Sequence, residues 1–230
     1  MKKFLVIVPT RTRNANHLEF AQEFFKNSKI SDLMFGLDED NQHQYDRIPG
    51  ARYHSHPRSE TRMAGTLNFL ANKYASQYEY IVSMGDDHRI RTPEWDTIIY
   101  EKIKNIPLCV AYGNDLIKGE LLSTAVVMDS CIIRTLGFMN PPLLVHAFVD
   151  NFWMDLGKEL GTLTYFPEVI IEHMHYVVNK AVQDDLYLET SVNHWPDHTT
   201  YSDYLTTQFQ QDVEKLKHIQ QQYLLLKNNI

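Results

Sequence analysis

Three consecutive side chains that can bind a metal ion, Asp86, Asp87 and His88, follow a segment rich in apolar residues, 80–84. The β-forming residues before Gly85 predict a buried strand, and such a strand presents the next side chains at its C-terminal edge, where α/β sheets bind ligands. Carboxylate and imidazole groups both bind divalent cations, and an imidazole ligand favours a borderline metal such as manganese over magnesium. We therefore expect the chemistry of this protein at this turn.

The sequence leaves open which aspartate of the turn binds the metal together with His88. Asp86 and His88 are two residues apart and would point the same way from an extended turn, whereas Asp87 could instead be the ligand beside His88. A further ligand is expected from the second half of the chain, where His173 and His175 follow a short apolar run. A structural role is the alternative, because an aspartate here can also form a turn with its own backbone.

Strands and helices alternate through the first half of the chain, which predicts a parallel sheet with right-handed crossovers. The expected strands are 4–8, 33–36 and 80–84, and the expected helices are one capped by Asn14 or Asn16 and one over 59–76, opened by Ser59. In the second half, strands are expected at 108–112, 121–128 and 168–171, and helices at 93–103, 129–137 with Asp129 as cap, and 150–161. From Thr199 onward, apolar residues at spacings of three and four predict one long C-terminal helix.

Composition narrows the class of protein. The chain has 230 residues, of which 43% are hydrophobic, so it can bury the core of one domain. Its formal charge of −7 argues against a broadly basic surface for nucleic acid. Only two cysteines, Cys109 and Cys131, argue against a disulfide framework. The sequence predicts no signal peptide and no transmembrane segment, so we expect a cytoplasmic protein.

Several short motifs follow one another along the chain: Val8–Arg11 after the first strand, Asp38 after the second, Arg62 in a helix, the acidic turn, and the segment 149–152, Val-Asp-Asn-Phe. In this order and spacing, residues 4–176 resemble the GT-A class of nucleotide-sugar-dependent glycosyltransferases. The resemblance implies an α/β fold with a GT-A-like, Rossmann-type mixed sheet flanked by helices, to which the long C-terminal helix is added. The implied division is a catalytic domain, 1–178, made of a nucleotide-donor half, 1–105, and an acceptor half, 106–178, followed by a C-terminal extension, 179–230.

The resemblance also implies roles for individual residues. The class usually holds its divalent cation, Mn²⁺ or Mg²⁺, through an Asp-x-Asp motif, from which this turn departs in a way similar to the Asp-x-His of the polypeptide N-acetylgalactosaminyltransferases. The implied metal ligands are Asp86, Asp87, His88 and His173. Asp150 is the favoured base for the acceptor's proton, with Asp155 in reserve. The residues expected to hold the donor nucleotide and its phosphates are Thr10, Arg11, Asp38, Arg62 and Asp86, with Arg13 near enough to help.

We therefore expect a metal-dependent, inverting glycosyltransferase that moves a sugar from a nucleoside diphosphate, with a UDP-sugar favoured, to an acceptor hydroxyl. The acceptor is open between a glycan, a small molecule and a hydroxymethylated base in phage DNA; the basic groove for DNA would be formed by Arg47, Arg52, Arg58, Arg89 and Arg91. Three alternatives remain: a nucleotidyltransferase or pyrophosphorylase, a metal-dependent hydrolase of nucleotide-sugars, and a non-catalytic nucleotide-sugar-binding module. The C-terminal helix could also pair with a second copy of the chain.

Overall fold

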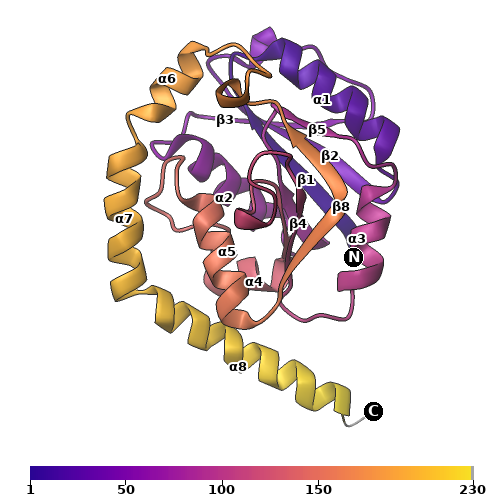
Figure 1. The fold of residues 1–230 in the computed structure, drawn as a ribbon, viewed down its shortest axis with the longest axis vertical. Helices are drawn as coiled ribbons and strands as arrows, with labels where there is room; N and C mark the ends of the chain where they lie inside the picture. The colour runs from indigo at the N-terminus through magenta and orange to yellow at the C-terminus, as the bar shows by residue number, and fades with distance from the viewer. Residues whose placement is uncertain (229–230) are drawn as a thin grey trace.

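The computed structural model describes residues 1–228, which form a curled mixed sheet with helices on both faces (Figure 1). Within these residues the sheet has eight strands in the order β3-β2-β1-β4-β7-β6-β8-β5. The strands are β1 (Lys2–Thr10), β2 (Ser31–Asp38), β3 (Arg52–His56), β4 (Tyr78–Ser83), β5 (His88–Ile90), β6 (Val110–Asn114), β7 (Val126–Asp129) and β8 (Leu163–His173). The helices are α1 (Asn14–Asn27), α2 (Arg62–Tyr74), α3 (Trp95–Ile103), α4 (Ser130–Leu136), α5 (Val149–Leu160), α6 (Asp185–Ser191), α7 (His194–Thr207) and α8 (Phe209–Asn228). The mixed α/β architecture that the sequence predicts is confirmed.

The N-terminal half of the sheet is parallel and is centred on β1. Strand β1 lies between β2 and β4, and β3 extends the sheet beyond β2 in the same direction. Every residue from Phe4 to Val8 is fully buried, as expected for a central strand that is covered on both faces. Leu5 and Ile7 pack in the core with α2, α4, α5 and α8, whereas Phe4, Val6 and Val8 pack on the opposite face with α1 and α3.

The C-terminal half makes the sheet mixed. Strand β7 runs antiparallel to β4 and β6, β6 runs parallel to β8, and β5 runs antiparallel to β8. Strands β4 and β5 are consecutive in the chain, yet they lie at different places in the strand order. The chain therefore crosses from the middle of the sheet to its edge at residues 84–87, which include the two aspartates of the predicted metal site.

Some boundaries differ from the sequence prediction. Helix α1 begins at Asn14 itself, with Arg13 in the cap position, and α2 begins at Arg62, three residues after Ser59. The expected strand 121–128 is shortened to β7, which begins at Val126, and a 3-10 turn occupies Gly119–Leu121. The predicted cap of α4 is confirmed, since the Asp129 carboxylate accepts a hydrogen bond of 2.8 Å from the backbone N–H of Cys131.

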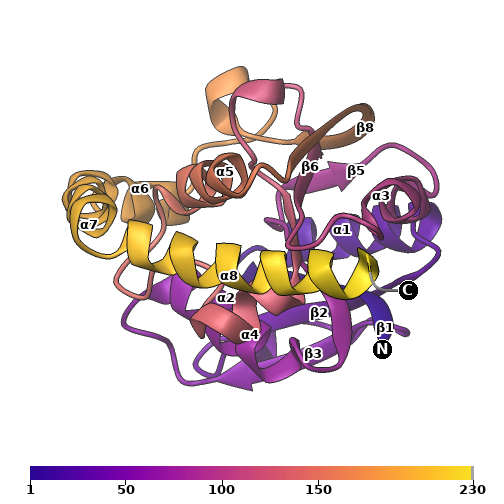
Figure 2. The ribbon, with the colours of Figure 1, turned by 90° about the horizontal axis from the view of Figure 1, so that it is seen from below.

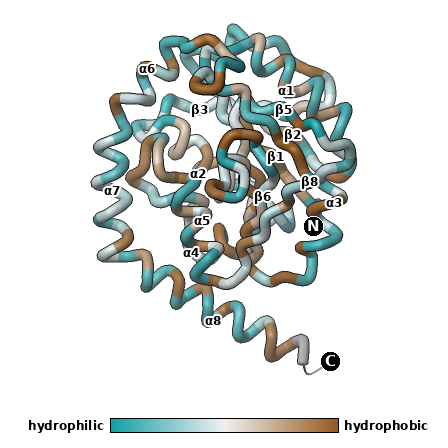
Figure 3. The backbone as a smooth tube through the Cα atoms, viewed as in Figure 1, coloured by the Kyte–Doolittle hydropathy of each residue, from teal (hydrophilic) through white to brown (hydrophobic). Residues whose placement is uncertain are grey.

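The predicted single C-terminal helix is wrong: two helices, α7 and α8, are separated at Gln208. The break lets α8 run across one side of the molecule, against α4 and α5, which lie on either side of it in the view of Figure 2. Val213 and Leu216 are fully buried there and belong to the core that also contains residues of α5. Hydrophobic and hydrophilic stretches alternate along α8 (Figure 3). In the part of the chain that the structure describes, no helix is both long and apolar enough to cross a membrane.

Candidate functional site

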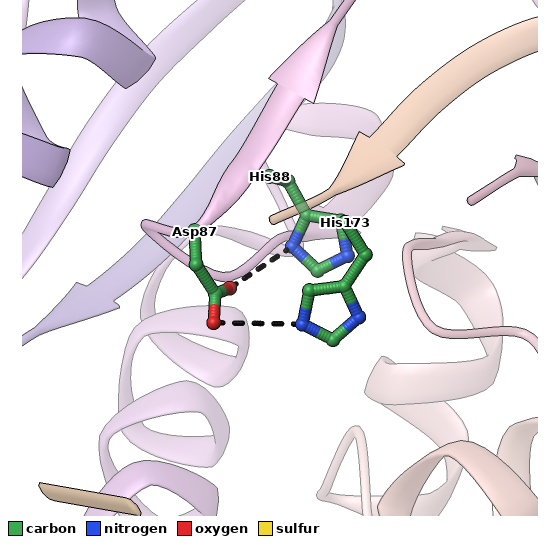
Figure 4. A group of neighbouring side chains, drawn as sticks. All are labelled: Asp87, His88 and His173. Atoms are coloured by element: carbon green, nitrogen blue, oxygen red, sulfur yellow. Dashed lines mark ion pairs between the residues drawn. The ribbon is translucent and has the colours of Figure 1, made fainter. Parts of the chain in front are cut away.

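The predicted metal-binding turn joins β4 to β5, and strand pairing brings a distant histidine to it. β5 pairs with β8 in a register that sets His88 opposite His173. The backbone of the turn is also tied to β8, because the N–H of Met174 donates to the carbonyl of Asp87 at 2.8 Å. As a result, the ligand atoms of Asp87, His88 and His173 all lie within 4.8 Å of one another (Figure 4).

The geometry of this cluster fits a divalent cation. The two carboxylate oxygens of Asp87 lie 3.6 Å from Nδ1 of His88 and 3.5 Å from Nε2 of His173, and both rings point toward that carboxylate (Figure 4). Nδ1 of His88 also accepts a hydrogen bond of 2.9 Å from the backbone N–H of Gly85, whereas its other ring nitrogen, Nε2, is buried and has no hydrogen-bond partner among the described residues. One carboxylate and two imidazoles form a donor set that suits a borderline divalent metal.

The protonation states support the same interpretation. Burial lowers the pKa of His88 to about 4, so its imidazole is neutral near pH 7 and can act as a ligand. Burial alone would raise the pKa of Asp87, but the hydrogen bond to His173 and the neighbouring positive charges outweigh burial and hold that pKa well below its usual range. The pair therefore presents a carboxylate and a neutral ring without any need for proton release at neutral pH.

Asp86 is adjacent in sequence but has a different environment. Its carboxylate accepts a hydrogen bond of 2.5 Å from Oγ1 of Thr10 and lies 3.4 Å from the guanidinium of Arg13. Burial, followed by the charge of Asp87, raises the pKa of Asp86. Of the two pairings that the sequence leaves open, the structure groups Asp87 with the histidines and directs Asp86 toward the end of β1.

The other predicted donor residues form ion pairs with acidic neighbours. Arg11 donates to Asp38 at 2.8 Å and to both oxygens of Asp40 at 2.6 and 2.7 Å. Arg62, at the start of α2, pairs with Glu189 from α6. These contacts hold two guanidinium groups in the wall of the site's cavity, one just after the carboxyl end of β1 and one at the start of α2.

Asp150 lies in the first turn of α5. Its carboxylate accepts a hydrogen bond of 3.1 Å from the N–H of Asn151, and burial raises its pKa. A raised pKa brings a carboxylate closer to the range in which it can take and release a proton near neutral pH. Asp155, the reserve candidate, has another role, because it accepts a hydrogen bond of 2.7 Å from the hydroxyl of Tyr201.

All predicted site residues line one cavity of about 770 Å³, which opens beside the Asp-Asp-His turn. They are Thr10, Arg11, Asp38, Arg62, Asp86, Asp87, His88, Asp150 and His173. His175 lines the cavity as well, but its Nδ1 accepts from the backbone N–H of Val177 at 3.2 Å. The structure thus brings together residues that are up to 163 positions apart in the sequence (Thr10 to His173), but it assigns them no roles.

Sequence reasoning missed much of the cavity wall that comes from the C-terminal extension. Tyr187 of α6 donates a hydrogen bond of 2.8 Å to Asp87, and Asp184 pairs with Arg13 at 2.7 Å. Arg13 also lies 3.5 Å from Asp87. The sequence predicts only that Arg13 could help to hold the donor nucleotide, not that it contacts the metal-capable cluster. The local sequence of α6 carries no pattern that indicates these contacts, because they depend on how the extension folds back.

Comparison with solved structures defines the class of fold, although no family model and no curated protein sequence matches this chain. A mannosyltransferase from Pyrobaculum calidifontis in complex with GDP-Man and Mn²⁺ superposes with a TM-score of 0.59 at 10% identity, over 94% of this chain and 73% of that one. S. aureus TarS 1–349 gives 0.53 at 14% identity, over 74% and 59% of the two chains. The catalytic domain of Drosophila β1,4-galactosyltransferase 7, in complex with xylobiose, gives 0.51 at 14%, over 80% and 76%. The protein has the GT-A-type fold of nucleotide-diphospho-sugar transferases, as the sequence resemblance implies.

Proposed function

We propose that the protein is a metal-dependent glycosyltransferase that moves a sugar from a nucleoside diphosphate donor to an acceptor hydroxyl. One observation carries the proposal: the cluster of Asp87, His88 and His173 lines the same cavity as Asp150, on a GT-A-type fold. A cation site alone would fit a hydrolase equally well. Asp150 is a second carboxylate in that cavity, and its raised pKa suits it to take the proton of an attacking hydroxyl. A base serves an attacking water equally well, so it is the GT-A-type fold that favours transfer to a hydroxyl over hydrolysis.

Asp87, His88 and His173 would hold the cation, with Mn²⁺ the first metal to test. When bound, the cation would supply charge neutralisation for a diphosphate leaving group. In the proposal, Thr10 and Asp86 meet the ribose, while Arg11 and Asp38 meet the base. Asp38 is an acceptor for the N–H edge of uracil, which makes a UDP-sugar the first donor to test.

Asp150 is the proposed base in an inverting transfer. Its carboxylate would take the proton of the acceptor hydroxyl, whose oxygen forms a bond to the anomeric carbon as the bond from that carbon to the donor phosphate breaks. The electron pair of the broken bond leaves with the nucleoside diphosphate. Attack from the face opposite the leaving group inverts the configuration at the anomeric carbon.

A glycan or small hydroxyl-bearing molecule suits the site better than modified DNA. The predicted basic groove is largely used within the protein: Arg89 is buried and pairs with Glu19, and Arg91 pairs with Glu172. Arg52 donates to the hydroxyl of Tyr78. The net charge of −7 further disfavours a polyanionic acceptor.

The test is a thermal-unfolding panel of nucleoside diphosphates and their sugars, with and without Mn²⁺. A ligand that binds only the folded state raises the unfolding temperature. At a ligand concentration of about 100 times Kd, the free energy of unfolding rises by roughly 2.7 kcal/mol. We expect one nucleotide class to raise it, more so with Mn²⁺, and expect the D87A/H88A double variant to lose the metal effect. A response to none of the nucleotides would overturn the proposal, and turnover without any acceptor would favour a hydrolase.

A further inference from the structure

The segment that contains α6 folds over the candidate site and covers it with acidic groups. Asp184 accepts two hydrogen bonds from Arg13, of 2.7 Å from Nε and 2.9 Å from Nη2. The ring of Tyr187 packs against the same guanidinium, 4.2 Å from its carbon, while its hydroxyl donates to Asp87. A single helical turn of the extension therefore contacts both the cationic and the metal-capable parts of the cavity.

A second acidic contact lies one turn further along α6. Oε1 of Glu189 pairs with both Arg58 and Arg62. Arg58 lies in the loop between β3 and α2, and Arg62 begins α2, so the two arginines come from one connection. Both line the cavity, as does Glu189 itself. The carboxylate is thus the common partner of two guanidinium groups that face the same space.

The arginines belong to the body of the protein, whereas the carboxylates belong to a loosely packed helix. The side chain of Arg13 is only 10% exposed, between β1 and the start of α1. By contrast, no residue of α6 is buried, and Leu188 on it is 54% exposed. No side chain of α6 belongs to the apolar core; Asp184, Tyr187 and Glu189 attach it through polar contacts, and the Tyr187 ring also packs on His175 and Tyr176, with centroids 4.9 and 4.7 Å apart. Such an attachment can be exchanged for a ligand with the same charge.

Guanidinium groups bind carboxylates and phosphates with the same paired geometry. We propose that Arg13, Arg58 and Arg62 form an anion site for the two phosphate groups of a diphosphate ligand, which Asp184 and Glu189 fill until the ligand displaces them. The choice of a diphosphate rests on the proposed function; the anion site itself rests on the ion pairs. Departure of α6 also removes the Tyr187 hydroxyl from Asp87, so the anion site and the metal-capable cluster become accessible together.

The probe for this site is inorganic pyrophosphate, which carries the two phosphates without base or sugar. Its affinity is measured by calorimetry on the full chain, for the wild type and for Asp184→Asn, Glu189→Gln and the double variant. Asparagine retains the ability of residue 184 to cap α6, where it accepts from the N–H of Tyr187 at 3.0 Å. Glu214→Gln, at an exposed position on α8, removes one negative charge and so matches each single variant in net charge.

We expect the double variant to bind pyrophosphate at least about tenfold more tightly than the wild type, equivalent to roughly 1.4 kcal/mol, and Glu214→Gln to match the wild type. Equal or weaker binding by the double variant, or no binding by any variant, would overturn the anion site. The same tightening in Glu214→Gln would also overturn it, since it would reduce the effect to net charge.

Amide hydrogen exchange gives an independent readout of the displacement. Pyrophosphate should raise the exchange rate of residues 184–195 in the wild type, and slower exchange there would show that α6 closes on the ligand, against the proposal. The outcome is separable from the proposed function. If the double variant binds pyrophosphate more tightly but no nucleotide or nucleotide-sugar raises the unfolding temperature, the anion site is retained and the transferase is rejected. If the protein turns over a nucleotide-sugar but the double variant binds pyrophosphate no more tightly than the wild type, the transferase is retained and the anion site is rejected.

Discussion

His88 and His173 lie opposite each other on adjacent antiparallel strands, with their ring centroids 4.4 Å apart and their planes inclined by only 16°. The two rings have opposite tendencies, because burial lowers the pKa of His88 to about 4 whereas Asp87 overcomes the effect of burial and raises the pKa of His173. Two stacked imidazoles that share one carboxylate gain little as isolated side chains. The arrangement is understandable if a cation completes it.

Removal of one ring should therefore weaken metal binding without unfolding the protein. His173 is at the end of β8 and is partly exposed, so His173→Ala leaves the core intact. We expect Mn²⁺ affinity, measured by calorimetry, to fall at least about tenfold, or roughly 1.4 kcal/mol. His218→Ala, at an exposed position on α8, removes an imidazole elsewhere and should bind Mn²⁺ as the wild type does. Wild-type affinity in His173→Ala would contradict the assignment of the cluster.

The turn also depends on a glycine. A Cβ at Gly85 would lie 2.5 Å from Oδ1 of Asp87 and 3.0 Å from Nδ1 of His88. Gly85→Ala must therefore displace the Asp87 carboxylate and crowd the His88 ring, and we expect it to reduce Mn²⁺ affinity about as much as loss of a ligand does. Because the displaced atoms are in side chains at the cavity, urea unfolding should show a loss of no more than about 1–2 kcal/mol. Unchanged metal affinity would show that the turn adapts, and that the cluster geometry is not needed.

Substitution of Asp150 should affect turnover, whereas substitution of Asp155 should affect stability. Asp150→Asn removes the proposed base but keeps its shape, so we expect turnover to fall about 10²- to 10⁴-fold while the Kd of the donor is nearly unchanged. Asp155→Asn alters the partner of the Tyr201 hydroxyl between α5 and α7, so it should lower stability, by roughly 1 kcal/mol, and leave turnover close to wild type. Initial rates and urea unfolding of both variants test these two roles. Equal losses of rate in the two variants would contradict the assignment of Asp150, rather than Asp155, as the base.

The elements that the sequence predicts well are those specified by local signals. The continuous apolar residues of β1 identify a central strand, and Asp129 followed by Gly137 at φ 83° marks both ends of α4. The strand that ends at the Asp-Asp-His turn belongs to the same group. Because each of these signals lies within a few residues of the element it specifies, no knowledge of the rest of the chain is needed.

The parts that were mispredicted depend on distant contacts. The apolar stripe of the C-terminal region continues through Gln208, yet the helix breaks there, and Tyr204, Gln208 and Lys215 all donate to Asp212 around the break. Nothing in the spacing of the stripe distinguishes one helix from two. The break becomes favourable only because α8 then packs Val213 and Leu216 into the core.

The candidate site shows the same division. The carboxyl ends of β1 and β4 bring Thr10 near Asp86, as expected for neighbouring parallel strands. The choice of Asp87 over Asp86 beside the histidines depends on the register between β5 and β8, which the sequence does not specify. The contribution of α6 was not predictable either, because Tyr187 reaches Asp87 from 100 positions away.

A further prediction concerns stability and uses a histidine remote from the metal-capable cluster. His17 of α1 is fully buried; its Nε2 lies 2.9 Å from the hydroxyl of Tyr53, and its Nδ1 has no hydrogen-bond partner in the described part of the chain. Burial lowers its pKa from an ordinary 6.5 to about 4. Between these values the unfolded chain binds a proton that the folded protein does not, so stability must decrease as pH falls.

His17→Phe tests this linkage because phenylalanine fills the ring space beside Phe35, 4.4 Å away, and cannot titrate. The difference in unfolding free energy between wild type and variant should shift in favour of the variant as pH falls from 7 to 4, by up to roughly 3 kcal/mol. Urea unfolding at pH 7, 5.5 and 4 measures it, and taking the difference cancels the carboxylates that titrate in both proteins. His43→Gln, at an exposed position, should keep the wild-type pH dependence. A difference that stays constant over this range would mean that His17 binds its proton equally in the folded and unfolded states, against the lowered pKa of a buried ring.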